Sequence, residues 1–209
     1  IEKARTDLQA TLDHQVRLTK SYSWFVPAQF LEFLDKENIT EIRLGDNVQR
    51  EMTLLFSDIR SFTTLSEQMS PQENFDFINR YLRRIGPVVR ENRGFIDKYM
   101  GDGVMALFPH TADDAVATAV HMQLAVAGFN ADRQLEGKPA IRFGVGIHTG
   151  LMMLGTVGEE ERMDGTVISD AVNLASRLEG LTKVYGVVTI ISRKTKDAMA
   201  DPDRYGYRF

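Results

Sequence analysis

The sequence has no cysteine, no long apolar run and no excess of positive charge, and each absence narrows its class. Without cysteine among its 209 residues it has no disulfide, thiolate metal site or cysteine nucleophile, which fits a cytoplasmic location. No apolar run approaches the ~20 residues that a membrane-spanning helix needs. A formal net charge of -4 indicates no general nucleic-acid surface. A protein of this charge that handles polyphosphate needs metal ions and a few well-placed basic residues.

An initiating methionine is also missing, since the chain opens on Ile1, and this predicts a piece of a longer protein. A weak heptad pattern over residues 1–22 is typical either of the last turns of a coiled coil or of a solvated linker helix. The aromatic segment from Trp24 to Leu34 is expected to pack against the following domain. We therefore predict an N-terminal signalling helix and lead-in segment over 1–48, and one globular domain over 49–209.

Two helices of that domain have clear starts. Ser70-Pro71-Gln72-Glu73 combines a capping box with a proline at the first helical position, and an apolar stripe from Phe75 to Val89 predicts the core-facing side. Thr111 caps a second helix. Its predicted inner stripe is Ala115, Ala119, Met122, Val126 and Phe129.

The strands follow from alternating or continuous apolar runs. Alternation over 141–148 predicts a strand whose glycines allow a close approach by another backbone or a ligand, and a turn is expected around Gly155 and Gly158. A third helix is expected from Ala171 to about Lys183, with Leu174 and Leu178 toward the core. The first six elements form the βαββαβ unit of a ferredoxin-like α+β sandwich.

Two aspartates each stand at the end of an apolar run. Leu54-Leu55-Phe56 predicts a buried strand that stops at Asp58, and Asp102-Gly103 between two apolar runs predicts a hairpin with Asp102 at its tip. Brought together, the two carboxylates could hold Mg²⁺ through oxygen. Taken singly, each aspartate is better explained as a turn residue.

A few polar side chains stand where an ordinary fold does not require them. Asn173 and Arg177 are four residues apart on one helix face, an arrangement that suits a planar anion such as phosphate but also an ordinary solvated face. Lys98 lies within a strand, where a cation needs a sheet edge, a partner or a function. Thr166, at the end of another strand, offers a hydroxyl that can both donate and accept.

Three stretches resemble the signatures of class III nucleotide cyclase catalytic domains, in the family's order and separation. They are Phe56-Ser57-Asp58-Ile59-Arg60-Ser61-Phe62-Thr63, Asp97-Lys98-Tyr99-Met100-Gly101-Asp102-Gly103 and the segment from Thr166 to Leu178. Residues 21–27 are similar to the lead-in of cyanobacterial-type cyclases, which an upstream sensor regulates. The resemblance runs from about residue 24 to the C-terminus and implies the cyclase type of ferredoxin-like fold.

The resemblance implies a reaction in which the ribose 3′-oxygen of a nucleoside triphosphate attacks the α-phosphorus and expels pyrophosphate. Asp58, the Ile59 carbonyl and Asp102 then hold two Mg²⁺ ions per site, for which Mn²⁺ can substitute. Asn173 orients the ribose, and Arg177 neutralises charge developing on the α-phosphate.

The resemblance also implies how the remaining parts of the substrate are held. Lys98 and Thr166 face adenine, which favours ATP, because guanylate cyclases of this family usually carry an acidic residue at the lysine position. Threonine at position 166 replaces a frequent aspartate, as in the bicarbonate-responsive subgroup, so bicarbonate sensitivity is an expectation. The residues implied to bind the outer phosphates are Ser61, Phe62 and Thr63, through backbone amides, and Arg162.

Family sites form between two chains, so the resemblance implies a homodimer in which one chain supplies the aspartates and its partner supplies Lys98, Thr166, Asn173 and Arg177. A family lysine on a C-terminal strand is expected after Phe209. The first hypothesis is therefore an adenylate cyclase that converts ATP to 3′,5′-cyclic AMP and pyrophosphate. Guanylate cyclase and a catalytically silent nucleotide-sensing dimerisation module are the alternatives, while the acidic balance opposes an RNA-binding domain.

Overall fold

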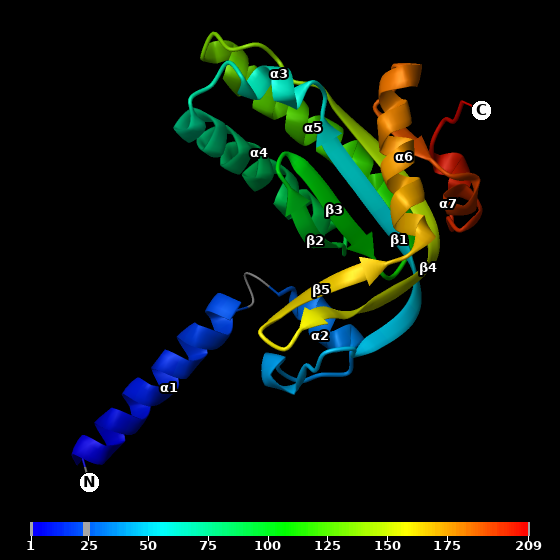
Figure 1. Cartoon of the computed structure of the whole chain (residues 1–209). Coiled ribbons are helices and arrows are strands. Elements are labelled where there is room, and N and C mark those ends of the chain that lie inside the picture. The colour runs from blue at the N-terminus through cyan, green and yellow to red at the C-terminus, as the bar shows by residue number, and fades with distance from the viewer. Residues whose placement is uncertain (1, 23–25, 209) are drawn as a thin grey trace. The chain divides into compact units, whose positions relative to one another are not determined.

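The computed structural model describes residues 2–22 and 26–208 (Figure 1). The helices are α1 (Glu2–Tyr22), α2 (Ala28–Phe33), α3 (Phe62–Ser66), α4 (Pro71–Glu91), α5 (Ala112–Leu135), α6 (Asp170–Tyr185) and α7 (Arg193–Asp197), with 3₁₀ turns η1 (Ile39–Glu41) and η2 (Pro202–Arg204). The strands are β1 (Asn47–Ile59), β2 (Phe95–Met100), β3 (Gly103–Phe108), β4 (Phe143–Glu159), β5 (Arg162–Ile168) and β6 (Thr189–Ile191). No helix in the described ranges is both long and apolar enough to cross a membrane.

The chain divides into two compact units, which are described separately. Unit 1 consists of Ile1–Val48 and Leu154–Thr166, and unit 2 of Gln49–Met153 and Val167–Phe209. The division falls within strands β1, β4 and β5, so the backbone itself continues from one unit to the other.

Unit 1 contains the expected N-terminal helix α1, on which Leu12 and Val16 are exposed. Whether this helix joins a coiled coil stays a prediction. Of the predicted aromatic segment, Trp24 and Phe25 lie outside the described residues, whereas Phe30 on α2 is buried. Its ring packs on Gly165, where a Cβ would come within 2.9 Å of the ring, so β5 carries a glycine to admit it.

The described residues form a six-stranded sheet in the order β2-β3-β1-β4-β5, with β6 paired parallel to β4. Strand β3 pairs antiparallel with β1 on one side and with β2 on the other. The order β2-β3-β1-β4 is that of a ferredoxin-like sandwich, so the predicted α+β fold class is confirmed.

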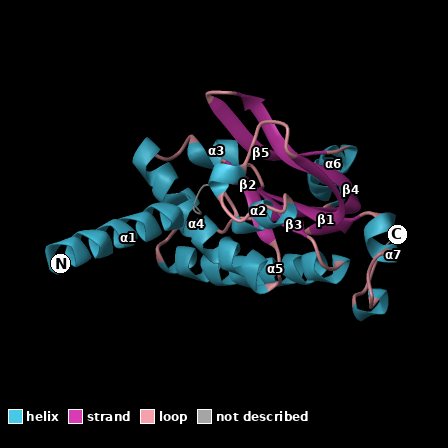
Figure 2. Cartoon of the chain, turned by 90° about the horizontal axis from the view of Figure 1, so that it is seen from below, coloured by secondary structure: helices cyan, strands magenta, loops and turns pink. Residues whose placement is uncertain are grey.

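Helices α4 and α5 lie together on one face of the sheet (Figure 2). The capping box at Ser70 is present, and the inner stripe predicted for α5 is buried throughout. The stripe predicted for α4 is wrong at Phe75, which is 69% exposed; Phe77 and Tyr81 face the core instead. Two sides of α4 carry apolar residues. The side with Phe77 and Tyr81 faces the core, because these two rings pack against Phe129.

Helix α6 lies on the opposite face. Along β4, Val145 and Ile147 point into the α4–α5 core, so the alternating Gly144 and Gly146 point the other way, toward α6. A Cβ on Gly146 would lie 2.2 Å from the backbone nitrogen of Glu179. The expectation that these glycines admit another backbone is confirmed.

The turn predicted around Gly155 and Gly158 is wrong, because β4 continues through both residues to Glu159. Gly155 is a strand residue whose missing side chain leaves room for the backbone of Asp46 and Asn47, both in unit 1. Gly158 has φ 131°, an extended conformation open to glycine, beside Arg162 on β5. Close backbone contact, and not chain reversal, explains both glycines.

Candidate active site

The two aspartates meet at the end of β1. Asp58 is the second-last residue of β1, and Asp102 lies in the turn between β2 and β3, as the hairpin signal predicted. The backbone N–H of Ile59 donates to Asp58 Oδ1 at 2.9 Å and to Asp102 Oδ2 at 3.0 Å. Burial, together with the adjacent Asp58, raises the pKa of Asp102 to about 7. Two like charges are therefore held side by side at a cost that a cation would remove.

This donor set fits a hard divalent cation. The oxygens that the structure brings together are those of the two carboxylates, beside the N–H of Ile59; the Ile59 carbonyl stays a predicted ligand. Within the described ranges no cluster of three or more His, Cys, Asp or Glu side chains is suited to a metal. Mg²⁺ in proteins is commonly held by one or two carboxylates, with waters and substrate phosphates completing its octahedron, so two carboxylates suffice.

The residues expected to cradle phosphates lie directly after β1. Ser61 has φ 57° and precedes the five-residue helix α3, and its side chain makes no capping hydrogen bond. The amides of Phe62 and Thr63 belong to the first turn of that helix, where N–H groups have no intrahelical partner. These amides are free to bind an acceptor near the carboxylates.

Asn173 and Arg177 are both exposed on α6. Ser169 caps this helix by accepting from the amide of Ala171, and its hydroxyl donates to the carbonyl of Leu151 at 2.6 Å. Asp58 and Asn173 of the same chain line one cavity of about 290 Å³, together with Ser57 and Glu179. Arg177, one turn further along, is not among its lining residues.

The core side of α6 is not the predicted one. Leu174 is 38% exposed and Leu178 only half-buried, while the buried residues are Ala171, Ala175 and Thr182. The buried side chains are small because the helix backbone at Ala175 and Glu179 contacts Gly146 of β4 directly. Leu174 therefore lies on the surface of this chain.

Lys98 lies on an edge strand of the sheet and has an ion-pair partner. Strand β2 is at the edge of the sheet order, and the register of its pairing with β3 shifts between Ile96 and Lys98. The extra residue is Asp97, whose nearly buried carboxylate lies 3.3 Å from the Lys98 ammonium. Burial raises the pKa of Asp97, and the neighbouring Lys98 opposes that shift.

Arg162 and Thr166 belong to unit 1, where both are on β5. Arg162 is the first residue of that strand and is exposed, whereas Thr166 is half-buried near its end. Of the predicted site residues, the structure brings together Asp58 and Asp102 at the Ile59 amide, and Asp58 and Asn173 around one cavity; it does not place Lys98 or Arg177 with them.

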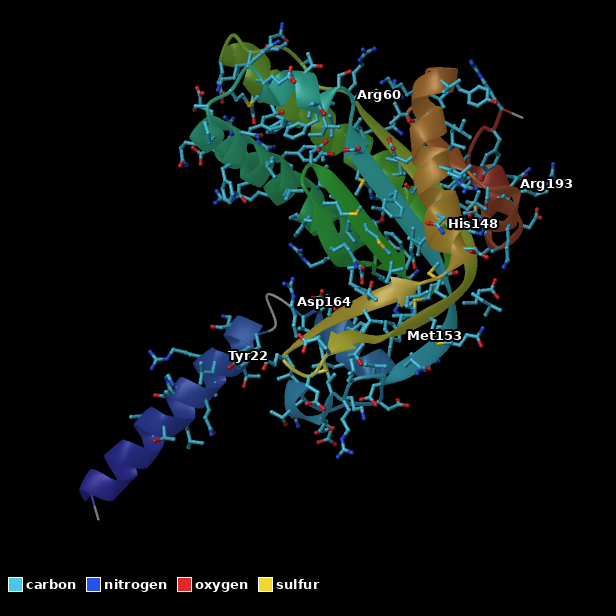
Figure 3. The ribbon with its side chains drawn as sticks, viewed as in Figure 1. Tyr22, Arg60, His148, Met153, Asp164 and Arg193 are labelled. Carbon is cyan, nitrogen blue, oxygen red and sulfur yellow. The ribbon has the colours of Figure 1, made fainter. Side chains whose placement is uncertain are left out.

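Sequence reasoning missed two residues near the paired aspartates. Glu179 lines the cavity with Asp58, and its pKa is raised by burial and by that aspartate. Arg60, labelled in Figure 3, follows β1 and binds main-chain carbonyls of the segment that ends α6. An arginine directly after a buried strand was the only signal for it, and its partners lie more than 120 residues away.

The fold and the paired carboxylates define a ferredoxin-like α+β domain with acidic groups crowded at one end of the sheet. The chain belongs to the family of adenylate and guanylate cyclase catalytic domains, whose model matches residues 46–207. That match includes every predicted site residue.

Named relatives include enzymes of both substrate types. An adenylate cyclase of Anabaena cylindrica is 42% identical over 206 residues, which is 96% of this chain and 41% of the relative. The guanylyl cyclase Cya2 has a TM-score of 0.67 and 34% identity over 74% of this chain and 81% of that one. The adenylyl cyclase CyaB from P. aeruginosa has a TM-score of 0.67 and 31% identity over 74% and 83%. The chain thus spans about two fifths of the Anabaena relative.

Proposed function

We propose that this chain is an adenylate cyclase that converts ATP to 3′,5′-cyclic AMP and pyrophosphate. The observation that carries the proposal is the meeting of Asp58 and Asp102 at the single N–H of Ile59, because it creates a cation-binding end beside free helix amides. The names of the Anabaena relative and of CyaB support ATP as the substrate.

Asp58, Asp102 and the Ile59 carbonyl hold two Mg²⁺ ions, or Mn²⁺ in their place. When bound, the ions lower the pKa of the ribose 3′-hydroxyl and neutralise the triphosphate. The amides of Phe62 and Thr63 after Ser61 bind the outer phosphates, assisted by Arg162. Asn173 holds the ribose so that its 3′-oxygen lies in line with the α-phosphorus, and Arg177 compensates the charge that develops there.

Lys98 and Thr166 select the base. The ammonium of Lys98 donates to adenine N1, and the threonine hydroxyl accepts from the 6-amino group. Guanine would present an N1–H donor to the lysine, leaving two donors unpaired in a buried contact. The ion pair with Asp97 supports this assignment, because it keeps the lysine charged and so a donor.

GTP is the competing substrate, favoured by the 34% identity to the guanylyl cyclase Cya2. Assays with ATP and GTP separately, at varied Mg²⁺ and Mn²⁺, decide between them. We expect cyclic AMP formation to exceed cyclic GTP formation by at least tenfold, and equal rates would contradict the base assignment. Lys98→Ala should lower the ratio of cyclic AMP to cyclic GTP formation. Lys138 is an exposed lysine in the loop after α5, and Lys138→Ala should leave that ratio unchanged.

The active form is a homodimer with shared sites, in which α6 of one chain faces the aspartates of its partner. Asp58→Ala and Asn173→Ala chains should each be inactive alone and regain activity when mixed, because one complete site forms. The cavity that Asp58 and Asn173 line within one chain supports a different arrangement, a site within each chain. A mixture without activity would favour that arrangement.

The chain's regulation and location are further parts of the proposal. Its lead-in, similar to that of sensor-regulated cyclases, supports control by an upstream domain, and its lack of cysteine supports a cytoplasmic location. Thr166 supports stimulation by bicarbonate. Rates measured at constant pH with added bicarbonate or chloride test that last point, and equal rates would remove it.

A further inference from the structure

Arg60 connects the metal-binding end of β1 to the end of α6. Its Nη2 donates to the main-chain carbonyl of Thr182 at 3.0 Å and also to that of Val187. Its own amide donates to the carbonyl of Arg142, which fixes the backbone from which the side chain extends. Figure 3 labels Arg60 beside the end of β1. One guanidinium thus binds a carbonyl in the last turn of the helix and another just after the helix ends.

These bonds are made at the C-terminal end of the helix. The Thr182 carbonyl also accepts from the amides of Gly186 and Val187, so Arg60 adds a bond to a helix end that backbone hydrogen bonds already close. A cation at this end also opposes the negative end of the helix dipole. At the other end Ser169 binds both the first turn and Leu151 on β4. Between these two anchors the helix rests on Gly144 and Gly146, which have no side chains to interlock with it.

We propose that Arg60 is a positioning residue for α6, and that it acts on catalysis through Asn173 and Arg177 rather than through Asp58 two residues away. This inference rests on the proposed cyclase function. Because the shared site combines α6 of one chain with the aspartates of another, the Arg60 of a given chain serves the site in which that chain supplies α6.

The two catalytic residues should depend on Arg60 unequally. Asn173 lies one turn from the Ser169 anchor, whereas Arg177 lies nearer to Thr182, the carbonyl that Arg60 holds. Loss of the Arg60 hydrogen bonds at the C-terminal end of α6 should therefore displace Arg177 more than Asn173. Since Arg177 compensates charge in the transition state, Arg60→Leu should lower kcat roughly ten- to hundredfold and change KM for ATP little.

Mixed dimers separate the two routes by which Arg60 could act. In a mixture of Asp58→Ala and Asn173→Ala chains, the active site takes α6 from the first chain and the aspartate from the second. Arg60→Leu on the Asp58→Ala chain should reduce activity about as much as in the unmixed enzyme. The same change on the Asn173→Ala chain should leave activity within about twofold of the parent mixture, an effect near 0.4 kcal/mol.

Controls and contrary outcomes complete the experiment. Arg142→Leu on the Asp58→Ala chain replaces an exposed arginine and should have no effect. Loss only on the Asn173→Ala chain would show action through the metal-binding end, and equal loss on both would show a merely structural role; either result overturns the inference.

An inactive parent mixture would instead refute the shared sites, which is a failure of that part of the proposed function and not of this inference. Arg60 is then tested in the otherwise unsubstituted chain, where a drop in kcat at constant KM, partly restored by Arg60→Lys, supports the inference. A rise in KM that accounts for the whole loss overturns it.

Discussion

The two faces of the sheet in unit 2 are held by opposite kinds of contact. On the α4–α5 face, large side chains such as Phe77, Tyr81 and Met122 fill the space between helix and sheet. On the α6 face, the helix backbone meets Gly146 directly, Gly144 is covered by the side chains of Thr182 and Glu179, and the buried residues of the helix are small. The α4–α5 face therefore buries a large apolar area, whereas the α6 face buries little.

The difference fits the proposal that the catalytic residues of α6 lie on the second face. A layer of large side chains can repack when one of them changes, so it stabilises the fold without fixing any one atom closely. A helix whose backbone packs directly on a strand can shift very little. The side chains on its outer side are therefore held in place as well. Asn173 and Arg177 are on the helix seated in this way.

The largest effect on activity is expected from Gly146→Ala. The new methyl group would lie 2.2 Å from the Glu179 nitrogen and 2.3 Å from the Ala175 carbonyl, so α6 must move away from β4. We expect a loss of roughly a hundredfold in kcat, because small displacements of catalytic groups cost about that much. The free energy of unfolding should fall by about 1–3 kcal/mol. Cyclase assays measure kcat, and urea unfolding measures the free energy of unfolding. An unchanged kcat would show that the contact between α6 and Gly146 does not position the catalytic residues.

Met122→Ala should produce the opposite pattern on the other face. Met122 is fully buried in the α4–α5 core, so its truncation should lower the free energy of unfolding by about 2–5 kcal/mol. Below its unfolding transition the variant should keep kcat within about twofold, since α6 is untouched. Paired assays at 10 °C and urea unfolding test this. A hundredfold loss of kcat in folded protein would mean that both faces position the site.

A smaller effect is expected from pH, at the end of the sheet that carries the aspartates. The pKa of Asp102 is about 7, above its ordinary 3.8, so protonation favours the folded state. That stabilisation is complete below pH 4 and is lost as the pH rises through 7. Metal-free protein should therefore show a falling thermal midpoint from pH 5 to 8, and Asp102→Asn should flatten the slope.

Mg²⁺ should flatten the same slope in the parent chain, because a bound cation keeps both carboxylates ionised. Asp164→Asn, an exposed aspartate of unit 1, is the matched control and should leave the slope as it was. An Asp102→Asn variant with the parent's slope would show that the aspartates are not crowded.

The smallest effect is expected from Gly180→Ala on α6. This glycine has nothing within 4 Å of the position where a Cβ would stand, in contrast to Gly146 on the facing strand. Alanine should raise the free energy of unfolding by about 0.4–1 kcal/mol and leave kcat unchanged. Urea unfolding and the same assay measure this. Loss of activity would show that α6 tolerates no change at all, on either side.

Much of the fold was predictable because local signals agreed with it. The cap at Ser70, the stripe of α5 and the Asp102 hairpin all depend on neighbouring residues, so the sequence indicates them directly. Phe75 was misassigned because the same helix offered two apolar faces. Gly155 was read as a turn because a glycine that admits a distant backbone has no local signature.

The candidate site divides in the same way. Asp58, Asp102, Asn173 and Arg177 could be singled out because they lie in segments that resemble the family's signatures; taken singly, turn residues and a solvated helix face explained them better. The ion pair of Lys98 with Asp97 needed a shift of strand register, and the role of Arg60 needed carbonyls 122 and 127 residues away. Interactions of that kind are set by which strands pair, and no single segment records them.

By itself the sequence determined the order of elements, the ferredoxin-like class and the residue types available for chemistry, because periodicity, caps and turns act over a few residues. Only the tertiary structure decided that Asp58 and Asp102 share one amide, that α6 rests on glycines and that Arg60 holds its end. The reason is physical. Repulsion between carboxylates and contact between backbones exist only once distant segments have been brought together.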